Sequence, residues 1–372
     1  MGNTSFMGGV SVVCTGDFGQ LPPVGESIIW EKSFIDGRPY LSPNHWDENF
    51  TIFYLEEKMR SLDQEFSKIS DKVRKGICDS EVYQYLKDHV KDSPNENSNS
   101  HYAEGKLSII VTTNAERDRI NLQKLEQLLP NEKAYTIDSK DEAIRRSNAP
   151  KPSKDLPHTQ TGQLESTFIF RKGAPVMVTS NHSDSRYKNN GIVNGARGYI
   201  DSIQVSKESS DVEVVWVVFM DESTGRLLRE DNKHLLKFHK PFNPRAVPIK
   251  KQRKRFHNNS WLREQFPLTL SYAVTAHKCQ GKTLDEVIID FSGKSRINAG
   301  SFYTAMSRVR FGCNLFLRDF KQEYIVANPD VEKKLQAMRA SVPYEFKKVK
   351  LDTKIFELPN DEVKIGYINI NS

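Results

Sequence analysis

The segment AHKCQGKT at residues 276–283 has a residue spacing that could bind phosphate. A phosphate loop of the form G-x-x-x-x-G-K-S/T cradles phosphates with its amides and reaches the β and γ oxygens with its lysine. Ala276 replaces the first glycine, and the following TLDEVIIDF becomes a strand instead of the long helix that faces the anion in such loops. These two features argue against a phosphate loop and leave a nucleic-acid contact loop and a basic surface turn as the alternatives.

A second segment with chemical potential is GDFGQLPPV at residues 16–24, which follows the apolar run GVSVVCT. Its two prolines fix φ and stiffen the loop, so the amide of Gln20 is held in a preset orientation. A proline-capped strand end without catalytic function is the alternative. The basic run KKQRKR at residues 250–255 predicts a nuclear address, a phosphate clamp or a solvated loop.

Composition limits the classes of protein that remain. The chain has 372 residues, 37% hydrophobic and 27% charged, which is typical of a globular protein with two or three domains. No run approaches the roughly 20 apolar residues of a membrane span, and no signal peptide or membrane partner is predicted. The net charge of +6 leans only slightly towards nucleic acid. Four widely separated cysteines predict neither a metal site nor disulfides, which suits a reducing compartment.

The elements that must position these segments follow an α/β pattern in the first part of the chain. Residues 9–15 predict a buried parallel strand, and TIFYLEEKMRS (51–61) a second strand. Ser61 and Gln64 have the spacing of a capping box, and Gly76 is the predicted stop of the helix that follows. KLSIIVTTN (106–114) predicts a strand that ends at Asn114, a suitable cap for the next helix.

From about residue 166 the pattern changes to short strands and turns, as in TFIFRKGAPVMVTSN and VEVVWVVFMD. The α/β pattern returns from 267 with a strand at DEVIID, a helix at SFYTAMSRVR and a strand at NLFLRDF. The predicted domains are 1–50 as the start of one α/β domain, 51–165 and 263–330 as a second, 166–262 as a β-rich insertion and 331–372 as a tail.

Five segments together resemble the C-terminal part of superfamily-one DNA helicases of the petite-integration-frequency (PIF) type, which are related to RecD-like and Helitron helicases. They are GDFGQLPPV, LEEKMRS, VTTNAERDRIN, GAPVMVTSN with NGIVNGARGYI, and SYAVTAHKCQGKTLDEVIID with YTAMSRVR. The resemblance implies an α/β fold: a RecA-like domain of the P-loop NTPase type with a small β-barrel-like insertion, plus a truncated remnant of a first RecA-like domain.

The resemblance also implies roles for residues near a nucleotide. Gln20 would sense the ATP γ-phosphate on a loop braced by Asp17, and Arg60 would reach the same phosphate. Arg308 would be the arginine finger, since a guanidinium offers a bidentate fork and cannot deprotonate. Gly281 completes the implied nucleotide contacts.

Single-stranded DNA is the implied partner. The loop TAHKCQGKT matches the family segment T-x-H-K-S-Q-G-x-T, with Cys279 at the usual serine, so that Thr275, His277 and Gln280 would line the strand path. Thr113 and Asn114 would join them. For Asn194 and Gly195, turn chemistry is the favoured interpretation.

One departure from the family is large. Neither a G-x-x-x-x-G-K-S/T loop nor an acidic Mg²⁺-binding pair precedes Gly16 in this sequence. We therefore expect a family member that is an ATP- and Mg²⁺-dependent 5′-to-3′ helicase, with this polypeptide inactive as an ATPase unless a separate N-terminal helicase segment complements it. A gene fragment, an incomplete gene or a degenerate transposon remnant would explain the departure.

Two alternatives to the helicase stay open: a non-hydrolysing module that binds single-stranded DNA, and an inert remnant. The resemblance further implies roles in DNA repair, recombination and telomere maintenance. It also implies nuclear residence, with the mitochondrion as the alternative.

Overall fold

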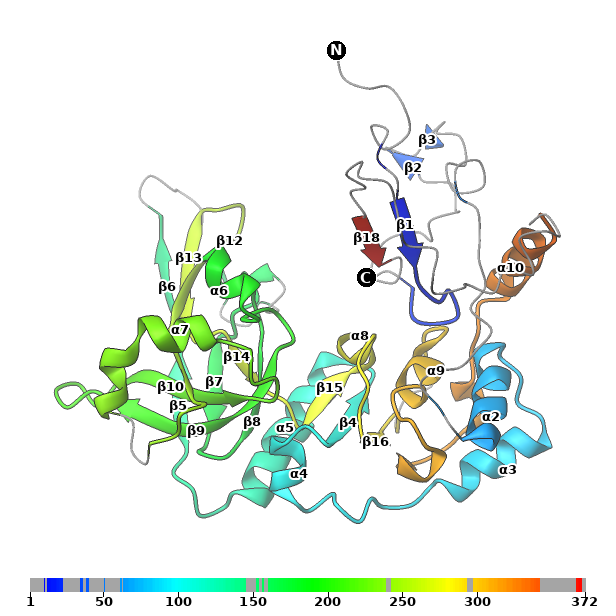
Figure 1. The fold of residues 1–372 in the computed structure, drawn as a ribbon, viewed down its shortest axis with the longest axis horizontal. Helices are drawn as coiled ribbons and strands as arrows, with labels where there is room; N and C mark the ends of the chain where they lie inside the picture. The colour runs from blue at the N-terminus through cyan, green and yellow to red at the C-terminus, as the bar shows by residue number, and fades with distance from the viewer. Residues whose placement is uncertain are drawn as a thin grey trace, which may run out of the picture. The chain divides into compact units, whose positions relative to one another are not determined.

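The computed structural model and Figure 1 describe how the elements of the chain connect. The described residues are 10, 12–22, 34–35, 38–39, 50, 61, 63–144, 152–153, 156, 160–238, 242–292, 297–341 and 366–369. The chain divides into two compact units. The first unit comprises Met1–His89, Gly293–Gly312 and Phe320–Ser372, and the second comprises Val90–Ser292 and Cys313–Asp319.

A parallel sheet forms one layer of the second unit. Its strands, in spatial order, are β15 (Ala273–Thr275), β4 (Leu107–Val111), β16 (Glu286–Ile289) and β17 (Leu315–Leu317). Every residue of β4 is buried, as expected for a central parallel strand made from a continuous apolar run. The strands predicted at KLSIIVTTN, DEVIID and NLFLRDF are confirmed.

Helix α5 (Asn114–Leu128) packs on this sheet. Ile120 and Leu125 enter the core, and Asn121 is buried with them. The Asn121 side chain donates to the carbonyl of Leu270 at 3.1 Å and accepts the N–H of Ala273 at 2.8 Å. Because one amide satisfies two main-chain groups, it fixes the helix onto β15. Two shorter helices of this layer are α4 (Asn99–Ala103) and α8 (Ala276–Cys279).

The remainder of the second unit is mostly antiparallel. Its largest sheet has the order β11 (Val247–Ile249), β10 (Val212–Phe219), β9 (Arg197–Val205), β8 (Pro175–Val178) and β14 (Leu268–Leu270). A second sheet has the order β12 (Gln252–Phe256), β13 (Trp261–Gln265) and β6 (Lys140–Ala143), and β5 (Tyr135–Asp138) pairs with β7 (Thr167–Phe170). The helical segments are α6 (Ser185–Asn189), α7 (Arg226–Asp231) and η3 (Lys233–Phe238). The predicted short strands are therefore present, and β5, β6 and β14 extend them beyond residues 166–262.

One hydrophobic core continues from the parallel sheet into the five-stranded sheet. It joins Leu107 and Val111 of β4 with Val176 of β8, Val215 of β10 and Val247 of β11. In Figure 1 the antiparallel strands lie beside the parallel strands of this unit. The β-rich segment thus shares its main core with the α/β layer, and the other face of β10 carries a smaller cluster around Trp216.

The first unit contains the other described elements. Its helices are α2 (Gln64–Arg74), α3 (Ser80–Asp88), α9 (Ser301–Met306) and α10 (Pro329–Ser341), with a 3-10 turn η5 (Gln322–Tyr324). Its strands are β1 (Val12–Thr15), which pairs with β18 (Gly366–Asn369), and β2 (Phe34–Ile35), which pairs with β3 (Arg38–Pro39). The turn η4 (Gly312–Asn314) precedes β17. The strand predicted at 51–61 lies outside the described residues except for Ser61.

Strand β1 is parallel to its neighbour, as predicted for residues 9–15, but it is not buried. Its residues alternate between half-buried and exposed, and Val13 is 49% exposed. The predicted burial is wrong because β1 pairs, among the described residues, with β18 alone. An apolar run indicates a strand, but its burial depends on layers that the run does not encode.

Two helix starts differ from the sequence prediction. Asp63, not Ser61, caps α2, and its carboxylate accepts a main-chain N–H of the first turn at 3.0 Å. Thr113, not Asn114, caps α5, and Asn114 is the first helical residue. Each true cap is the residue whose side-chain oxygen is spaced to reach the first free N–H groups. The stop predicted at Gly76 is confirmed, with a φ of 76° directly after the C-cap.

None of the helices in the described part of the chain combines the length and apolarity that crossing a membrane requires. None of the four cysteines, all of which the structure describes, forms a disulfide.

Candidate nucleotide and nucleic-acid sites

The loop after β1 is braced by the carboxylate of Asp17. Its Oδ1 accepts the N–H of Gly19 at 2.9 Å and two guanidinium N–H groups of Arg74 at 2.9 and 2.7 Å. Its Oδ2 accepts the hydroxyl of Tyr303 at 2.9 Å. Burial alone raises the pKa of Asp17, but the hydrogen bonds and charge of Arg74 outweigh it, so the pKa is lowered. The loop is therefore tied to α2 and α9.

The residues after Asp17 lie against α9. The N–H of Leu21 donates to the hydroxyl of Thr304 at 3.1 Å. Gly300, at the N-terminus of α9, has a φ of 76°, and a Cβ there would lie 2.6 Å from the carbonyl oxygen of Gln20. Only glycine permits this approach. The main chain at Gln20 is thus packed directly on the start of α9.

Arg308 follows the end of the same helix. Its Nε donates to the carbonyl of Thr304 at 2.8 Å, and its Nη2 donates to the hydroxyl of Ser307 at 2.8 Å. Its side chain is fully buried. Thr304 therefore connects the two predicted nucleotide residues, because its hydroxyl bonds the residue after Gln20 and its carbonyl bonds Arg308.

The other predicted nucleotide residues are placed differently. Arg60 lies outside the described residues. Gly281 belongs to the second unit and has a φ of 78°, with nothing within 4 Å of the position of a Cβ. Its backbone conformation, not crowding, explains the glycine. Among the residues that the structure describes, no three His, Cys, Asp or Glu side chains form a metal-binding group.

The predicted DNA-binding residues come from two neighbouring strands of the parallel sheet. Thr275 at the end of β15 pairs in register with Val111 at the end of β4. Thr113 and Asn114 follow β4 after one intervening residue, and the loop through Gln280 directly follows β15. Ligands of open parallel sheets bind at the carboxyl ends of the strands. The fold thus brings both predicted DNA segments to that edge.

Several side chains at this edge of the sheet already form hydrogen bonds within the chain. The hydroxyl of Thr113 accepts the N–H of Glu116 at 3.3 Å and lies 3.0 Å from its carboxylate. The side-chain oxygen of Asn114 accepts from Arg117 at 3.1 Å. Thr275 is 7% exposed. These contacts fix the side chains that the edge presents.

The loop after β15 is not a phosphate loop. Helix α8 has four residues, Ala276–Cys279, and the chain then turns at Gly281 and enters β16. A four-residue helix lacks the aligned peptide dipoles of the helix that a phosphate loop requires. The sequence argument against a phosphate loop is confirmed.

The remaining polar groups of this loop are partly buried. Burial lowers the pKa of His277, so its imidazole is uncharged near neutral pH. The Nε2 of Gln280 is buried and has no hydrogen-bond partner among the described residues. A buried amide without a partner is costly. It suits a loop that gains an acceptor when a ligand binds.

Two lysines of the loop contact the turn at residues 194–195. Lys278 Nζ donates to Asn194 Oδ1 at 2.9 Å, and Lys282 Nζ donates to the carbonyl of Gly195 at 2.9 Å. Burial lowers the pKa of Lys278, and the charge of Arg117 acts in the same direction. Burial also lowers the pKa of Lys282 to about 8.

The basic run at residues 250–255 forms strand β12 over most of its length, so the loop interpretation is wrong. Its cross-strand partners are on β13, where Arg253 pairs with Glu264 at 3.2 Å. Lys254 points to the opposite face of the sheet and donates to the carbonyl of Asn181 at 3.0 Å. Alternation divides the charges between two faces, so they do not form one basic patch.

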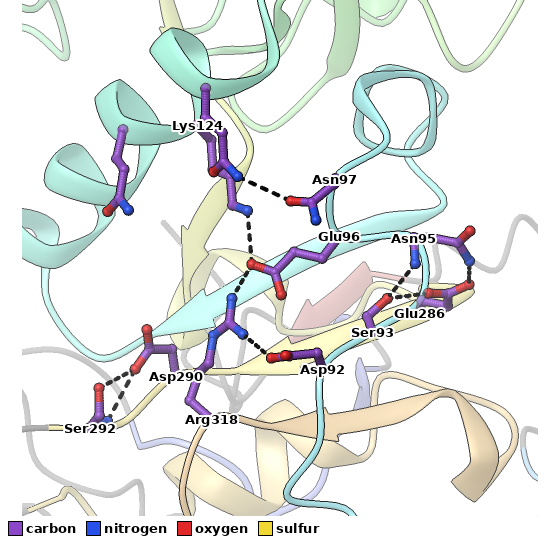
Figure 2. Close-up of polar contacts among 12 residues, drawn as sticks. Asp92, Ser93, Asn95, Glu96, Asn97, Lys124, Glu286, Asp290, Ser292 and Arg318 are labelled. Carbon is purple, nitrogen blue, oxygen red and sulfur yellow. Dashed lines mark hydrogen bonds and ion pairs between the residues drawn. The ribbon is translucent and has the colours of Figure 1, made fainter.

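A polar cavity of about 460 Å³ lies between α5 and the ends of β16 and β17. Figure 2 shows its central ion pairs, in which the carboxylate of Glu96 contacts both Lys124 and Arg318, and Arg318 also contacts Asp92 at 2.8 Å. Burial raises the pKa of Glu96, but the hydrogen bonds of Arg318 and Lys124 outweigh it, so the pKa is lowered. The two carboxylates and the two cations neutralise one another, and their ion pairs attach the 92–97 loop to α5 and β17.

Sequence reasoning missed the residues that hold the predicted ones in place: Arg74, Tyr303, Thr304, Lys278 and Lys282. A signal was present for two of them. Thr304 precedes Arg308 by four residues, which is one helical turn. Lys282 follows the loop glycine inside a segment already identified. Arg74 carried no local signal.

The parallel sheet with polar loops at its carboxyl ends defines the class of protein, an α/β fold. A solved Pif1 helicase from Candida albicans covers 91% of this chain and 70% of its own, with a TM-score of 0.67 and 20% identity. A Bacteroides Pif1 helicase in complex with ADP-AlF3 and single-stranded DNA covers 87% of this chain and 66% of its own, with a TM-score of 0.60 and 20% identity.

Relatives in sequence point to one kind of protein within this fold class, the DNA helicases. The ATP-dependent DNA helicase Pif1 of Bdellovibrio bacteriovorus is 26% identical over 336 residues, 87% of this chain and 61% of the relative. The ATP-dependent DNA helicase PIF1 of Xenopus laevis is 29% identical over 329 residues, 87% of this chain and 43% of the relative. No family model matches the chain. Over most of its length the chain is similar in sequence to PIF-type DNA helicases, as its motifs predicted.

Proposed function

We propose that this chain is the C-terminal part of an ATP-dependent, 5′-to-3′ DNA helicase of the PIF type. The observation that carries the proposal is the register of Val111 with Thr275, because it sets two polar loops on adjacent parallel strands. Both relatives named above are ATP-dependent DNA helicases and match 87% of this chain. The chain spans 61% and 43% of their lengths, so the activity of the whole protein is part of the proposal.

The nucleic-acid partner in this proposal is single-stranded DNA. Thr113, Asn114, Thr275, His277 and Gln280 line its path. Uncharged donors bond phosphates without locking them in place, which suits a strand that slides. Because the pKa of His277 is lowered, its imidazole is also uncharged near neutral pH. The Bacteroides structure with bound single-stranded DNA supports the choice of partner.

ATP is the nucleotide in this proposal. The amide of Gln20 and the guanidinium of Arg308 fit a triphosphate chemically. Thr304 contacts both segments, through the N–H of Leu21 next to Gln20 and through the guanidinium of Arg308. Arg60 and Gly281 are further contacts. Because Arg308 is fully buried, its guanidinium has to be uncovered before it reaches a phosphate. Mg²⁺ accompanies ATP in this proposal, with its acidic ligands supplied by a separate N-terminal helicase segment.

The proposal assigns a role to each part of the chain. Residues 1–50 are a remnant of a first RecA-like domain, 51–165 and 263–330 form the second, and 331–372 are a tail. Residues 166–262 are the β-barrel-like insertion, supported by the antiparallel order β11-β10-β9-β8. A nuclear or mitochondrial role in repair, recombination or telomere maintenance, and the link to Helitron elements, belong to the proposal as well.

Binding of a fluorescent oligothymidylate by the purified chain tests the DNA part. The affinity should fall with salt, and Gln280→Ala should weaken binding about tenfold through the loss of one charge-assisted hydrogen bond. Ser209→Ala, in an exposed turn of the same unit, is the matched control. Equal affinity of the Gln280 variant and the control contradicts the assignment of the loop.

ATP hydrolysis separates the helicase from its alternative. A non-hydrolysing DNA-binding module would bind oligothymidylate and remain without DNA-stimulated ATPase activity even when joined to an N-terminal helicase segment. An inert remnant would show a broad, uncooperative melt and no binding. Stimulated hydrolysis by the joined protein supports the helicase.

A further inference from the structure

The loop that carries His277, Gln280 and Gly281 is attached to one turn by two lysines, one on each side of its centre. Lys278 precedes Gln280 and reaches the side chain of Asn194, and Lys282 follows Gly281 and reaches the carbonyl of Gly195. Both N–O distances are 2.9 Å. The two contacts form what we call the double clasp.

The turn that receives the double clasp is itself rigidly held. The N–H of Ala196 donates to the carbonyl of Val193 at 3.0 Å, which closes a four-residue turn with Gly195 at its third position. Gly195 has a φ of 93°, as that position of a type II turn requires. Its N–H donates to Val178 of β8 at 2.8 Å. The carbonyl that Lys282 contacts is therefore fixed to the five-stranded sheet.

Lys282 stands at the position that the T-x-H-K-S-Q-G-x-T segment leaves open, so its contact is a feature of this chain's own sequence. Asn194 is anchored as well, because its N–H donates to the side chain of Asn181 at 2.8 Å. The centre of the loop, Gln280 and Gly281, lies between two attachment points on a rigid turn.

We propose that Lys282 is a positioning residue of the DNA site, which holds the Gln280–Gly281 bend against the turn at 194–195 in the geometry that binds a DNA strand. The proposal rests on the proposed function and adds a residue to it. Lys282 acts through the Gly195 carbonyl and does not contact the strand.

The charged and titratable groups around Lys282 give this role a pH dependence. Burial lowers its pKa to about 8, with the charge of Arg197 on β9 and of Lys278 on α8 in the same direction and Cys279 in the opposite one. Its ordinary value is 10.5. The ammonium is a stronger donor than the neutral amine, so the clasp weakens as pH rises through about 8.

The test compares oligothymidylate affinity for Lys282→Met, Lys282→Arg and wild type. The methionine variant should bind about tenfold more weakly, with the slope of log affinity against log salt unchanged, since no phosphate contact is lost. The arginine variant keeps a donor that stays charged, so it should retain affinity and lose the decline that wild type shows between about pH 7 and pH 9. Lys207→Met, an exposed lysine of the same unit, controls for net charge.

Each result has one meaning. A salt slope reduced by about one unit would show that Lys282 contacts a phosphate directly and would overturn the positioning role. Full affinity of the methionine variant overturns it too while leaving the proposed function intact, and a wild-type chain without affinity for DNA overturns both. If the methionine variant does not fold, Asn194→Ala removes the other half of the clasp and should weaken binding several-fold; full affinity there also counts against the clasp.

Discussion

The main-chain N–H of Leu21 donates to the hydroxyl of Thr304 at 3.1 Å, although the two residues are 283 positions apart in the chain. The carbonyl of the same threonine accepts from Arg308. A fully buried residue thus joins the loop of the predicted γ-phosphate sensor to the predicted arginine finger. One residue therefore contacts both segments, through its side chain and its backbone.

Replacing Thr304 with valine tests this connection. Valine keeps the shape but removes the hydroxyl, which leaves the buried N–H of Leu21 without its acceptor and should lower the free energy of unfolding by about 2 kcal/mol. Urea denaturation measures the loss, and Thr304→Ser, which keeps the hydroxyl, should retain most of the stability. Oligothymidylate affinity should not change, because the predicted DNA residues lie in the second unit. A valine variant as stable as wild type would remove Thr304 from this role.

The brace at Asp17 predicts a pH-dependent stability. Its pKa in the folded protein is lowered from 3.8. A lowered carboxyl pKa contributes stability that is fully present above the unfolded value, near 3.9, and is lost as pH falls through the folded value. Asp17→Asn should therefore be less stable than wild type at pH 7, and the difference should shrink below about pH 4. Urea midpoints from neutral to acidic pH measure it; a difference independent of pH would mean that the charge of Asp17 does not matter.

The role of Arg308 is tested in a protein in which the chain is rejoined to an N-terminal helicase segment. Arg308→Ala should reduce ATP hydrolysis by at least about 10³-fold, as expected for loss of an arginine finger. DNA affinity should stay close to that of wild type. Because Arg308 is fully buried, the melting temperatures of Arg308→Ala and Arg308→Lys need to be compared with wild type. Unchanged turnover in a folded variant rejects the finger role.

Local sequence patterns were sufficient to predict much of the fold. The strands β4, β16 and β17 are mostly apolar runs, and runs of this kind are typical of buried parallel strands. The run at β1 is as apolar, yet it is half-exposed, because burial depends on neighbouring layers. Strand β12 was missed since its six-residue basic run hides a period of two, which becomes visible only when β13 supplies Glu264 opposite Arg253.

The candidate site was predictable in part for the same reason. Gln20, Thr275 and Arg308 stand in motifs that can be read along the chain. The contacts that hold them, Thr304 with Leu21 and Lys282 with Gly195, join residues 283 and 87 positions apart. No local pattern specifies which threonine or lysine meets which main-chain group at such a separation. These partners follow from sheet register and helix placement, which require the structure.

The ion cluster in Figure 2 gives a prediction about the second unit alone. Glu96 is 8% exposed and Lys124 is 5% exposed. The carboxylate of Glu96 is the ion-pair partner of the buried Lys124 ammonium, and Arg318 is a second cation for the same carboxylate. Glu96→Gln leaves the ammonium of Lys124 without a carboxylate and should lower the free energy of unfolding by about 2 kcal/mol. This loss is smaller than the loss from breaking a fully buried ion pair, because Arg318, the other cation of the cluster, is partly exposed.

The double variant Glu96→Gln with Lys124→Met distinguishes two cases. Either the ion pair adds net stability, or each charge only offsets the cost of burying the other. If the pair mainly compensates its own burial, Lys124→Met should restore part of the stability that Glu96→Gln removes, since it takes away the uncompensated cation. The pKa of Glu96 is lowered in the folded protein. The stability difference between wild type and the Glu96→Gln variant should therefore shrink as pH falls below about 4, where the wild-type carboxylate also gains its proton. Purely additive losses at neutral pH would show instead that the two side chains contribute independently, through packing rather than charge.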